Sequence, residues 1–267
     1  MKNGQDRMTT DRVTTTIADQ VAHVRLARPD KMNALDPAMF TAIGAAIDGL
    51  RDRSDVRCVV LSGEGRAFCA GLDMASMAAG GSGMSAERNA DGCIMPQWVT
   101  WGWRQLPMPV IAAVHGVAFG GGFQIMSGAD IRIAAPDARF AIREAYWGLV
   151  PDMAGFPIWR GLVRDDVLRE LVYTAREFSG QEALAYGFVT RLADDPLAAA
   201  LALAGEIAAR NPRAVRGAKR LANAAHDADP RALLAMETEE QLRLIGQPNM
   251  IEAVAAHAQK RPPVFED

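Results

Sequence analysis

Two glycine-bearing segments carry residue types that can stabilise negative charge with main-chain groups. The first is residues 69–73 (Cys-Ala-Gly-Leu-Asp), and the second is residues 116–124, with three glycines at 120–122. Each follows a run of β-forming residues, at 58–62 and at 110–114. Glycine lets a backbone approach a ligand closely, and the N–H groups at the start of a helix lack intrahelical partners. If the fold brings the two turns together, two N–H donors can point at one oxygen, which is the arrangement of an oxyanion hole.

The elements that must position these turns follow from the hydrophobic pattern. Residues 14–17 and 21–26 predict a β-hairpin, and Asp36 with Pro37 predicts an N-cap and first turn for a helix that ends near 51–54. Residues 76–92 are rich in glycine and serine and predict a loop.

Further along, the pattern alternates between strands and helices and then becomes all-helical. Strands are expected at 110–114, 131–134 and 188–192, and helices at 96–106, 122–127, 164–174, 181–186, 197–210, 212–226, 231–246 and 249–259. We therefore expect an α/β core over residues 12–195 and a helical C-terminal part over residues 196–267 that can serve as a subunit contact.

The bulk composition is that of an ordinary globular chain of 267 residues, 49% hydrophobic and 23% charged. A net charge of −3 gives no electrostatic footprint for nucleic acid, and no run of apolar residues is long enough to predict a membrane span. Residues 1–11 are polar, lack the apolar stretch of a signal peptide, and are expected to be flexible, so a cytoplasmic location is expected. Three cysteines and four isolated histidines show no metal-ligand spacing, so no catalytic metal is expected.

Several spaced motifs resemble the crotonase, or enoyl-CoA hydratase/isomerase, superfamily. They are residues 28–35 (Arg-Pro-Asp-Lys-Met-Asn-Ala-Leu), 68–73, 109–122, 138–144, 147–151 and 260–262. They follow the family order over roughly residues 12–265, and several motifs in register are more specific than any one of them. The resemblance implies a crotonase fold of repeated ββα units that form two roughly perpendicular sheets, plus a helical C-terminal region that forms a homotrimer or a dimer of trimers. It also implies an acyl-CoA substrate and no cofactor beyond the CoA of that substrate.

By position, the resemblance assigns the two oxyanion donors to the backbone N–H groups of Leu72 and Gly121. One such donor is typically worth about 3 kcal/mol in the transition state. Many hydratases of the family carry a glutamate two residues after the third glycine and another twenty residues later, where this chain has Gln124 and Glu144. An amide cannot transfer a proton, although it can orient water or substrate.

Glu144 is the principal candidate for acid/base catalysis, because its apolar neighbours at 145–147 would raise its pKa towards the working range. An exposed turn would instead leave it an ordinary surface carboxylate. Dienoyl-CoA isomerases of the family carry a second catalytic acid at the position of Asp152, although they also have an acid at the position of Gln124. Asp152 follows a proline and can alternatively cap the next helix.

Contacts to substrate and CoA are carried over from the family motifs in the same way. They are Lys31, Met32, Ala34, Ala70, Gly71, Asp73, Met74, Gly120 and Lys260. The two lysines can equally be solvated surface residues, and Asp73 suits a cap that orients its loop. Trp98, Trp101 and Trp103 are candidates for the wall of an acyl pocket, or for the core.

These assignments predict an enzyme that stabilises a thioester enolate. The leading hypothesis is hydration of a 2-enoyl-CoA with Glu144 as the principal proton shuttle, and the alternative is an enoyl- or dienoyl-CoA isomerase that uses Glu144 and Asp152. A catalytically reduced CoA-thioester binding subunit is the candidate from another class. A dinucleotide-dependent oxidoreductase is set aside, because residues 116–122 do not have the GxGxxG spacing.

Overall fold

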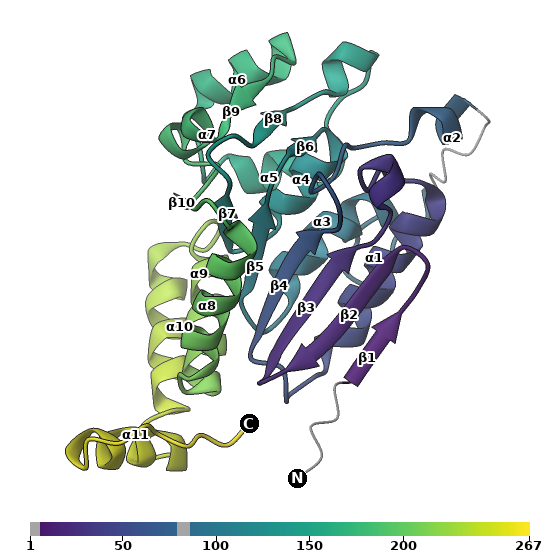
Figure 1. Ribbon diagram of the computed structural model, residues 1–267. Coiled ribbons are helices and arrows are strands. Elements are labelled where there is room, and N and C mark those ends of the chain that lie inside the picture. Colours follow the sequence, from purple (N-terminus) through teal and green to yellow (C-terminus); the bar gives the residue numbers. More distant parts are fainter. Residues whose placement is uncertain (1–5, 79–85) are drawn as a thin grey trace.

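The computed structural model describes residues 6–78 and 86–267 (Figure 1). Its strands are β1 (Asp6–Thr9), β2 (Val13–Ala18), β3 (Val21–Leu26), β4 (Cys58–Gly63), β5 (Val110–Val114), β6 (Val117–Phe119), β7 (Ile131–Ala134), β8 (Arg139–Ala141), β9 (Phe178–Ser179) and β10 (Arg191–Leu192). Among the described residues they form a seven-stranded sheet in the order β1-β2-β3-β4-β5-β7-β10 and a three-stranded sheet in the order β6-β8-β9.

The large sheet places both glycine turns at one edge. β2 and β3 form the expected antiparallel hairpin, whereas β3, β4, β5, β7 and β10 run parallel to one another. The carboxyl ends of neighbouring parallel strands lie at the same edge of a sheet. The turns that follow β4 and β5 therefore leave the sheet side by side.

The helices pack on both faces of the large sheet or extend beyond it. They are α1 (Pro37–Arg51), α2 (Met74–Ala78), α3 (Met95–Gln105), α4 (Gly121–Ser127), α5 (Gly155–Trp159), α6 (Asp165–Thr174), α7 (Gly180–Tyr186), α8 (Pro196–Ala208), α9 (Pro212–Ala224), α10 (Pro230–Leu242) and α11 (Pro248–Ala258), with 3₁₀ turns η1 (Pro29–Lys31) and η2 (Glu144–Trp147). The predicted cap of α1 is present, since the Asp36 side chain accepts a hydrogen bond from Met39 N at 2.8 Å.

Alternate residues of the central strands bury opposite faces of the sheet. Val59 and Leu61 of β4 join the main core with α1 and α3, whereas Cys58 and Val60 pack against α8 on the other face (Figure 1). A parallel strand covered on both faces is apolar along its length, which explains the continuous run at 58–61. The fold is the α/β arrangement of two sheets with flanking helices that the sequence predicted.

Three expectations about segment boundaries need correction. Residues 6–9 form strand β1 and pair with β2, a strand that the sequence did not predict within residues 1–11. The predicted loop at 76–92 begins later than expected, since α2 extends to residue 78, and residues 79–85 lie outside the described part of the chain. Helix α8 belongs to the packing of the core, because its small residues Ala200 and Ala204 let it lie directly on the sheet.

The last helices lie beside α8 and beyond it (Figure 1). They expose large apolar side chains. Leu234, Leu242, Ile245, Ile251 and Val254 are all more than half exposed. No helix within the described ranges is long and apolar enough to cross a membrane.

Candidate active site

The first glycine turn is held by backbone bonds to the segment that contains η1. Leu35 N donates to Gly71 O at 2.8 Å, and Asp73 N donates to Leu35 O at 3.0 Å. This parallel bridge pairs Leu35 with Leu72 and directs the Leu72 N–H away from Leu35. Within the described chain the Leu72 N–H donates no hydrogen bond, so it is free to bind an oxygen.

The second turn presents the other donor. Gly120 has φ +49° and is the N-cap of α4, so the Gly121 N–H belongs to the first helical turn and has no intrahelical acceptor. A Cβ at Gly71 would lie 2.6 Å from Phe119 O and 3.6 Å from Gly121 N, so the two turns touch and only glycine fits between them. The structure thus brings the two predicted oxyanion donors together.

Asn33 is a buried positioning residue that was not predicted from the sequence as part of the site. Its Nδ2 donates to Ala67 O at 2.8 Å and to Phe68 O at 3.1 Å, and its Oδ1 accepts from Arg28 N at 2.8 Å. These bonds tie the η1 segment to the chain that enters the first turn. The signal in the sequence was an asparagine within the first family motif. Asparagine tolerates a positive φ better than most residues, and the φ of Asn33 is +56°.

Gln124 and Glu144 contact each other inside the protein. Gln124 Nε2 donates to Glu144 Oε1 at 2.6 Å, and Gln124 Oε1 accepts from Met153 N at 3.0 Å and from Gly155 N at 3.1 Å. The Gln124 side chain is completely buried. Glu144 is 8% exposed, and its Oε2 is buried without a hydrogen-bond partner in the described residues.

The pKa of Glu144 is raised, chiefly by burial, while the hydrogen bond from Gln124 opposes that shift and the nearby charge of Asp152 adds to it. The reason for the burial differs from the expected one. Residues 145–147, the apolar neighbours in sequence, are exposed. Glu144 is instead buried towards Gly120, whose added Cβ would lie 3.6 Å from Glu144 Oε1.

Asp152 lies on the wall of a cavity of about 290 Å³ next to this carboxylate. The other lining residues come from the segment before α3, from α3 and from the segment that leads into α5: Cys93, Gln97, Trp101, Pro151, Ala154, Gly155, Phe156 and Pro157. Asp152 is exposed at this wall, and desolvation by its surroundings raises its pKa. Glu144 does not line this cavity, but it is close enough to Asp152 for that charge to act on it, and the pKa of each carboxyl is raised.

The three tryptophans of α3 divide between core and cavity. Trp103 is fully buried, and Trp98 packs on α1, where its Nε1 donates to Asp48 Oδ1 at 3.1 Å. Only Trp101 of the three lines the cavity described above. The prediction of a three-tryptophan pocket wall is therefore wrong for Trp98 and Trp103, because the helical repeat turns their side chains towards α1 and the core.

The residues predicted to contact CoA also lie in two separate parts of the molecule. Most lie around the first turn, where Met32, Ala34, Ala70 and Met74 are partly exposed and Lys31 is exposed. Asp73 caps its loop by accepting from Ala75 N and Ser76 N, and it pairs with Arg28 at 2.8 Å, which lowers the pKa of the Asp73 carboxyl.

Lys260 is exposed and follows α11, which lies at the opposite end of the molecule from α2 (Figure 1). The structure therefore does not bring Lys260 to this subunit's site.

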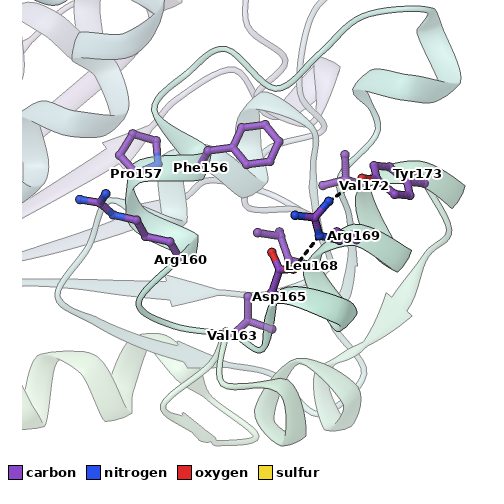
Figure 2. Close-up of a pocket in the computed structure, with 9 residues that line it drawn as sticks. All are labelled: Phe156, Pro157, Arg160, Val163, Asp165, Leu168, Arg169, Val172 and Tyr173. Carbon is purple, nitrogen blue, oxygen red and sulfur yellow. Dashed lines mark hydrogen bonds and ion pairs between the residues drawn. The ribbon is translucent and has the colours of Figure 1, made fainter. Parts of the chain in front are cut away.

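A second, larger cavity of about 700 Å³ opens beyond Phe156 and Pro157. Figure 2 shows it between α5 and α6, lined by Phe156, Pro157, Arg160, Val163, Asp165, Leu168, Arg169, Val172 and Tyr173. Arg169 is already engaged by Asp165 and Tyr173. In the part of the chain that the structure describes, no three His, Cys, Asp or Glu side chains gather in a way that could hold a metal ion.

Paired backbone donors beside two buried or desolvated carboxylates define a class of α/β proteins built to stabilise an enolate. Comparison with known proteins agrees with this class. The model of the enoyl-CoA hydratase/isomerase family matches residues 16–267, and the chain belongs to that family.

Relatives within the family have been named for two reactions. The chain is 36% identical over 216 residues to the mitochondrial Delta(3,5)-Delta(2,4)-dienoyl-CoA isomerase of Mus musculus; the match covers 77% of this chain and spans 66% of the length of the mouse protein. It is 32% identical over 249 residues to the enoyl-CoA hydratase EchA19 of Mycobacterium tuberculosis, with 91% and 92% of the two chains covered. The crystal structure of an enoyl-CoA hydratase from Bacillus anthracis superposes with a TM-score of 0.87 at 30% identity, covering 95% of this chain and 98% of the other.

Proposed function

We propose that this protein moves double bonds within unsaturated acyl-CoA thioesters, with Glu144 and Asp152 as its proton-transferring pair. The observation that carries the proposal is the bonding of Gln124, whose NH₂ group donates to Glu144 and whose carbonyl oxygen accepts from two backbone N–H groups. Hydration requires a held water molecule. Both lone pairs of the Gln124 oxygen are taken by backbone N–H groups, so the amide has no acceptor left for that water, and an amide takes up no proton; this residue therefore cannot replace the missing carboxylate of a hydratase.

Isomerisation needs only proton transfer, for which the proposed site has two backbone donors and two carboxylates. The N–H groups of Leu72 and Gly121 hold the thioester oxygen. One carboxylate removes a proton from C2, the C–H electron pair becomes an enolate conjugated with the remaining double bond, and the other carboxylate returns a proton at the far end of that system. The atoms balance without a redox agent, a metal or water, so CoA enters only as part of the substrate.

Raised pKa values suit this exchange. A carboxyl that is a stronger base than usual removes a C–H proton more readily once the enolate charge is stabilised. The two carboxylates have different surroundings, because Glu144 is buried against α4 and Asp152 is exposed at the cavity wall. The substrate lies between them, with its thioester at the two glycine turns and its acyl chain along the cavity that contains Trp101.

Hydration of a 2-enoyl-CoA is the second candidate, and the similarity to EchA19 across nearly the whole of both chains favours it. In that reaction Glu144 and Asp152 would have to handle both the water and the C2 proton. A positioned acid or base typically contributes about 10²–10⁴ in rate. A hydratase with Gln124 is therefore expected to be slow compared with the isomerase activity.

A panel of 2-enoyl-, 3-enoyl- and 3,5-dienoyl-CoA substrates, followed by mass spectrometry, tests the proposal. Isomerisation leaves the mass unchanged in H₂O and introduces deuterium in D₂O, whereas hydration adds the mass of one water. We expect isomerisation to dominate, and Asp152→Asn to abolish it. Product with added water as the main outcome, or full isomerase activity in Asp152→Asn, would reject the isomerase assignment. Binding without any turnover would instead favour the CoA-thioester binding subunit.

The assembly state is also part of this proposal. The exposed apolar side chains of α10 and α11 fit a contact with further copies of the chain, and we propose a homotrimer, which can pair into a hexamer. In such an assembly Lys260 could reach only a neighbouring subunit's CoA. Light scattering on the intact protein measures the copy number, and a monomer would contradict the proposal. A cytoplasmic location is proposed because all three cysteines are free thiols, and it is tested by cell fractionation.

A further inference from the structure

Gln124 contacts both segments that carry the carboxylates. On one side its Nε2 donates to Glu144 Oε1 at 2.6 Å. On the other side its Oε1 accepts from Met153 N and Gly155 N, the backbone just after Asp152. The side chain has no solvent exposure and stands on α4, the helix whose first N–H is an oxyanion donor. One rigid amide therefore joins the helix of the oxyanion donor to both proton-transfer segments.

The direction of the amide is fixed by its partners. Backbone N–H groups are donors only, so they must face the carbonyl oxygen of Gln124, and the NH₂ group must face Glu144. Glu144 Oε1 is thereby held as an acceptor in every protonation state. The carbonyl-type oxygen of a protonated carboxyl is the stronger acceptor, so the bond from Gln124 favours the proton of Glu144 on Oε2, the buried oxygen without a hydrogen-bond partner in the described residues.

We propose that Gln124 is a positioning residue that reserves Oε2 of Glu144 as its proton-transfer atom and fixes the backbone beside Asp152 relative to it. This role rests on the proposed isomerase function. It explains an amide at this position: the bond orients a general acid/base without adding a second titrating group next to it. The same contacts make Gln124 a specificity-determining residue, because they favour transfer between two separated carboxylates over activation of water.

A carboxylate at this position would behave differently. In Gln124→Glu the two backbone donors keep an acceptor, but an oxygen now faces Glu144 Oε1, and the two carboxyl groups share one proton. Proton transfer then no longer belongs to Oε2 alone. In Gln124→Met the side-chain volume is nearly kept, and all three hydrogen bonds are lost.

The charged groups around Glu144 do not mask the effect of the Gln124 substitutions on its pKa. Asp152 is the group whose charge acts on it, and the adjacent Arg143 is engaged by Glu177. Ionised Glu144 is the form that the Gln124 N–H stabilises, so removing that donor makes Glu144 bind its proton more tightly. The acid limb of the kcat/KM profile is therefore expected at higher pH in both variants.

Ser127→Ala provides a matched control on the same helix. Ser127 Oγ accepts from Trp159 Nε1 at 2.9 Å and donates to Phe123 O at 2.8 Å, so this substitution also removes buried hydrogen bonds from α4. We expect Ser127→Ala to lower Tm and to leave the acid limb in place. Gln124→Met should lower kcat by up to about 10²-fold, the usual cost of a misplaced catalytic group.

The experiment combines two measurements on the intact protein. The kcat/KM of isomerisation is measured against pH, and the Glu144 carboxyl is titrated by ¹³C NMR after labelling glutamate, with its signal identified by its loss in Glu144→Gln. A higher-pH titration in Gln124→Met and Gln124→Glu, but not in Ser127→Ala, supports the role. An unchanged Glu144 titration in both Gln124 variants overturns it. Because the NMR titration needs no turnover, it decides on Gln124 even if the isomerase assignment itself fails.

Discussion

Replacement of Glu144 by glutamine should remove activity and at the same time stabilise the protein at alkaline pH. The substitution keeps the shape of the side chain and an oxygen that can accept from Gln124 Nε2, but it removes the charge and the transferable proton. A positioned general acid or base is typically worth about 10²–10⁴ in rate, so kcat should fall by that factor.

The stability change follows from the surroundings of the carboxylate. A buried polar atom without a partner costs roughly 1–3 kcal/mol, and more when it is charged, whereas the charge strengthens the bond from Gln124 by about 1 kcal/mol. Because the pKa of Glu144 is raised despite that bond, burial outweighs it. We therefore expect Glu144→Gln to be more stable than the wild type at pH 8, by about 1 kcal/mol.

The sign of the pH dependence separates this account from a simple loss of packing. Well below pH 4.5, the ordinary pKa of a glutamate, the carboxyl is protonated in both the folded and the unfolded protein. Its ionisation then contributes nothing to the free energy of unfolding. As the pH rises through the raised folded pKa, ionisation in the folded state costs free energy. The gain in the free energy of unfolding of Glu144→Gln should thus appear at pH values above the folded pKa of Glu144 and vanish at low pH.

Denaturant unfolding of the wild type and the variant from pH 4 to pH 8 measures this difference. Glu182→Gln is the matched control with the opposite sign, because hydrogen bonds from Ser179 and Arg176 hold the pKa of Glu182 below its ordinary value. That variant should lose stability at pH 8 relative to low pH. Equal stability changes for Glu144→Gln at both ends of the range, or retained activity, would refute the reasoning.

Three further perturbations test the parts of the site. Gly71→Ala should lose about 10²–10³ in kcat, the value of one oxyanion donor, because the new Cβ would sit 2.6 Å from Phe119 O; Gly246→Ala, which has a similar positive φ but open space around it, should keep activity in the same assay. Asn33→Ala should destabilise the fold by roughly 2–4 kcal/mol in denaturant unfolding, because it leaves buried carbonyl groups without donors and loses the residue that tolerates positive φ. Trp101→Ala should raise KM for long acyl chains more than for short ones, whereas an equal change for both would show that Trp101 does not contact the chain.

Local sequence patterns were sufficient to predict most of the long strands and helices. The hairpin of β2 and β3, the capped helix α1 and the buried strands β4 and β5 each have a pattern that depends on their own residues. The short strands β6, β8 and β9 were not predicted, because two or three residues carry too little periodicity to distinguish a strand from a loop. Strand β1 was missed because its sequence is polar and it pairs only at the sheet edge.

The site divides in the same way. The glycine turns could be predicted because glycine reports on backbone geometry at its own position. The sequence could not assign the tryptophans of α3 to the core or to the cavity, because helical spacing alone does not say which face of a helix packs against the core. Sequence neighbours also gave the wrong reason for the environment of Glu144, which is buried by contacts with α4 and not by residues 145–147.

By itself, the sequence determined that this protein has the fold of its family, two glycine turns that each offer a backbone N–H group, and a glutamine at position 124. Only the tertiary structure decided what that glutamine does. Its amide lies between Glu144 and the backbone after Asp152, and hydrogen-bond direction leaves it one orientation. The physical reason is that a hydrogen bond depends on distance and direction between groups far apart in the chain, and residue type alone specifies neither.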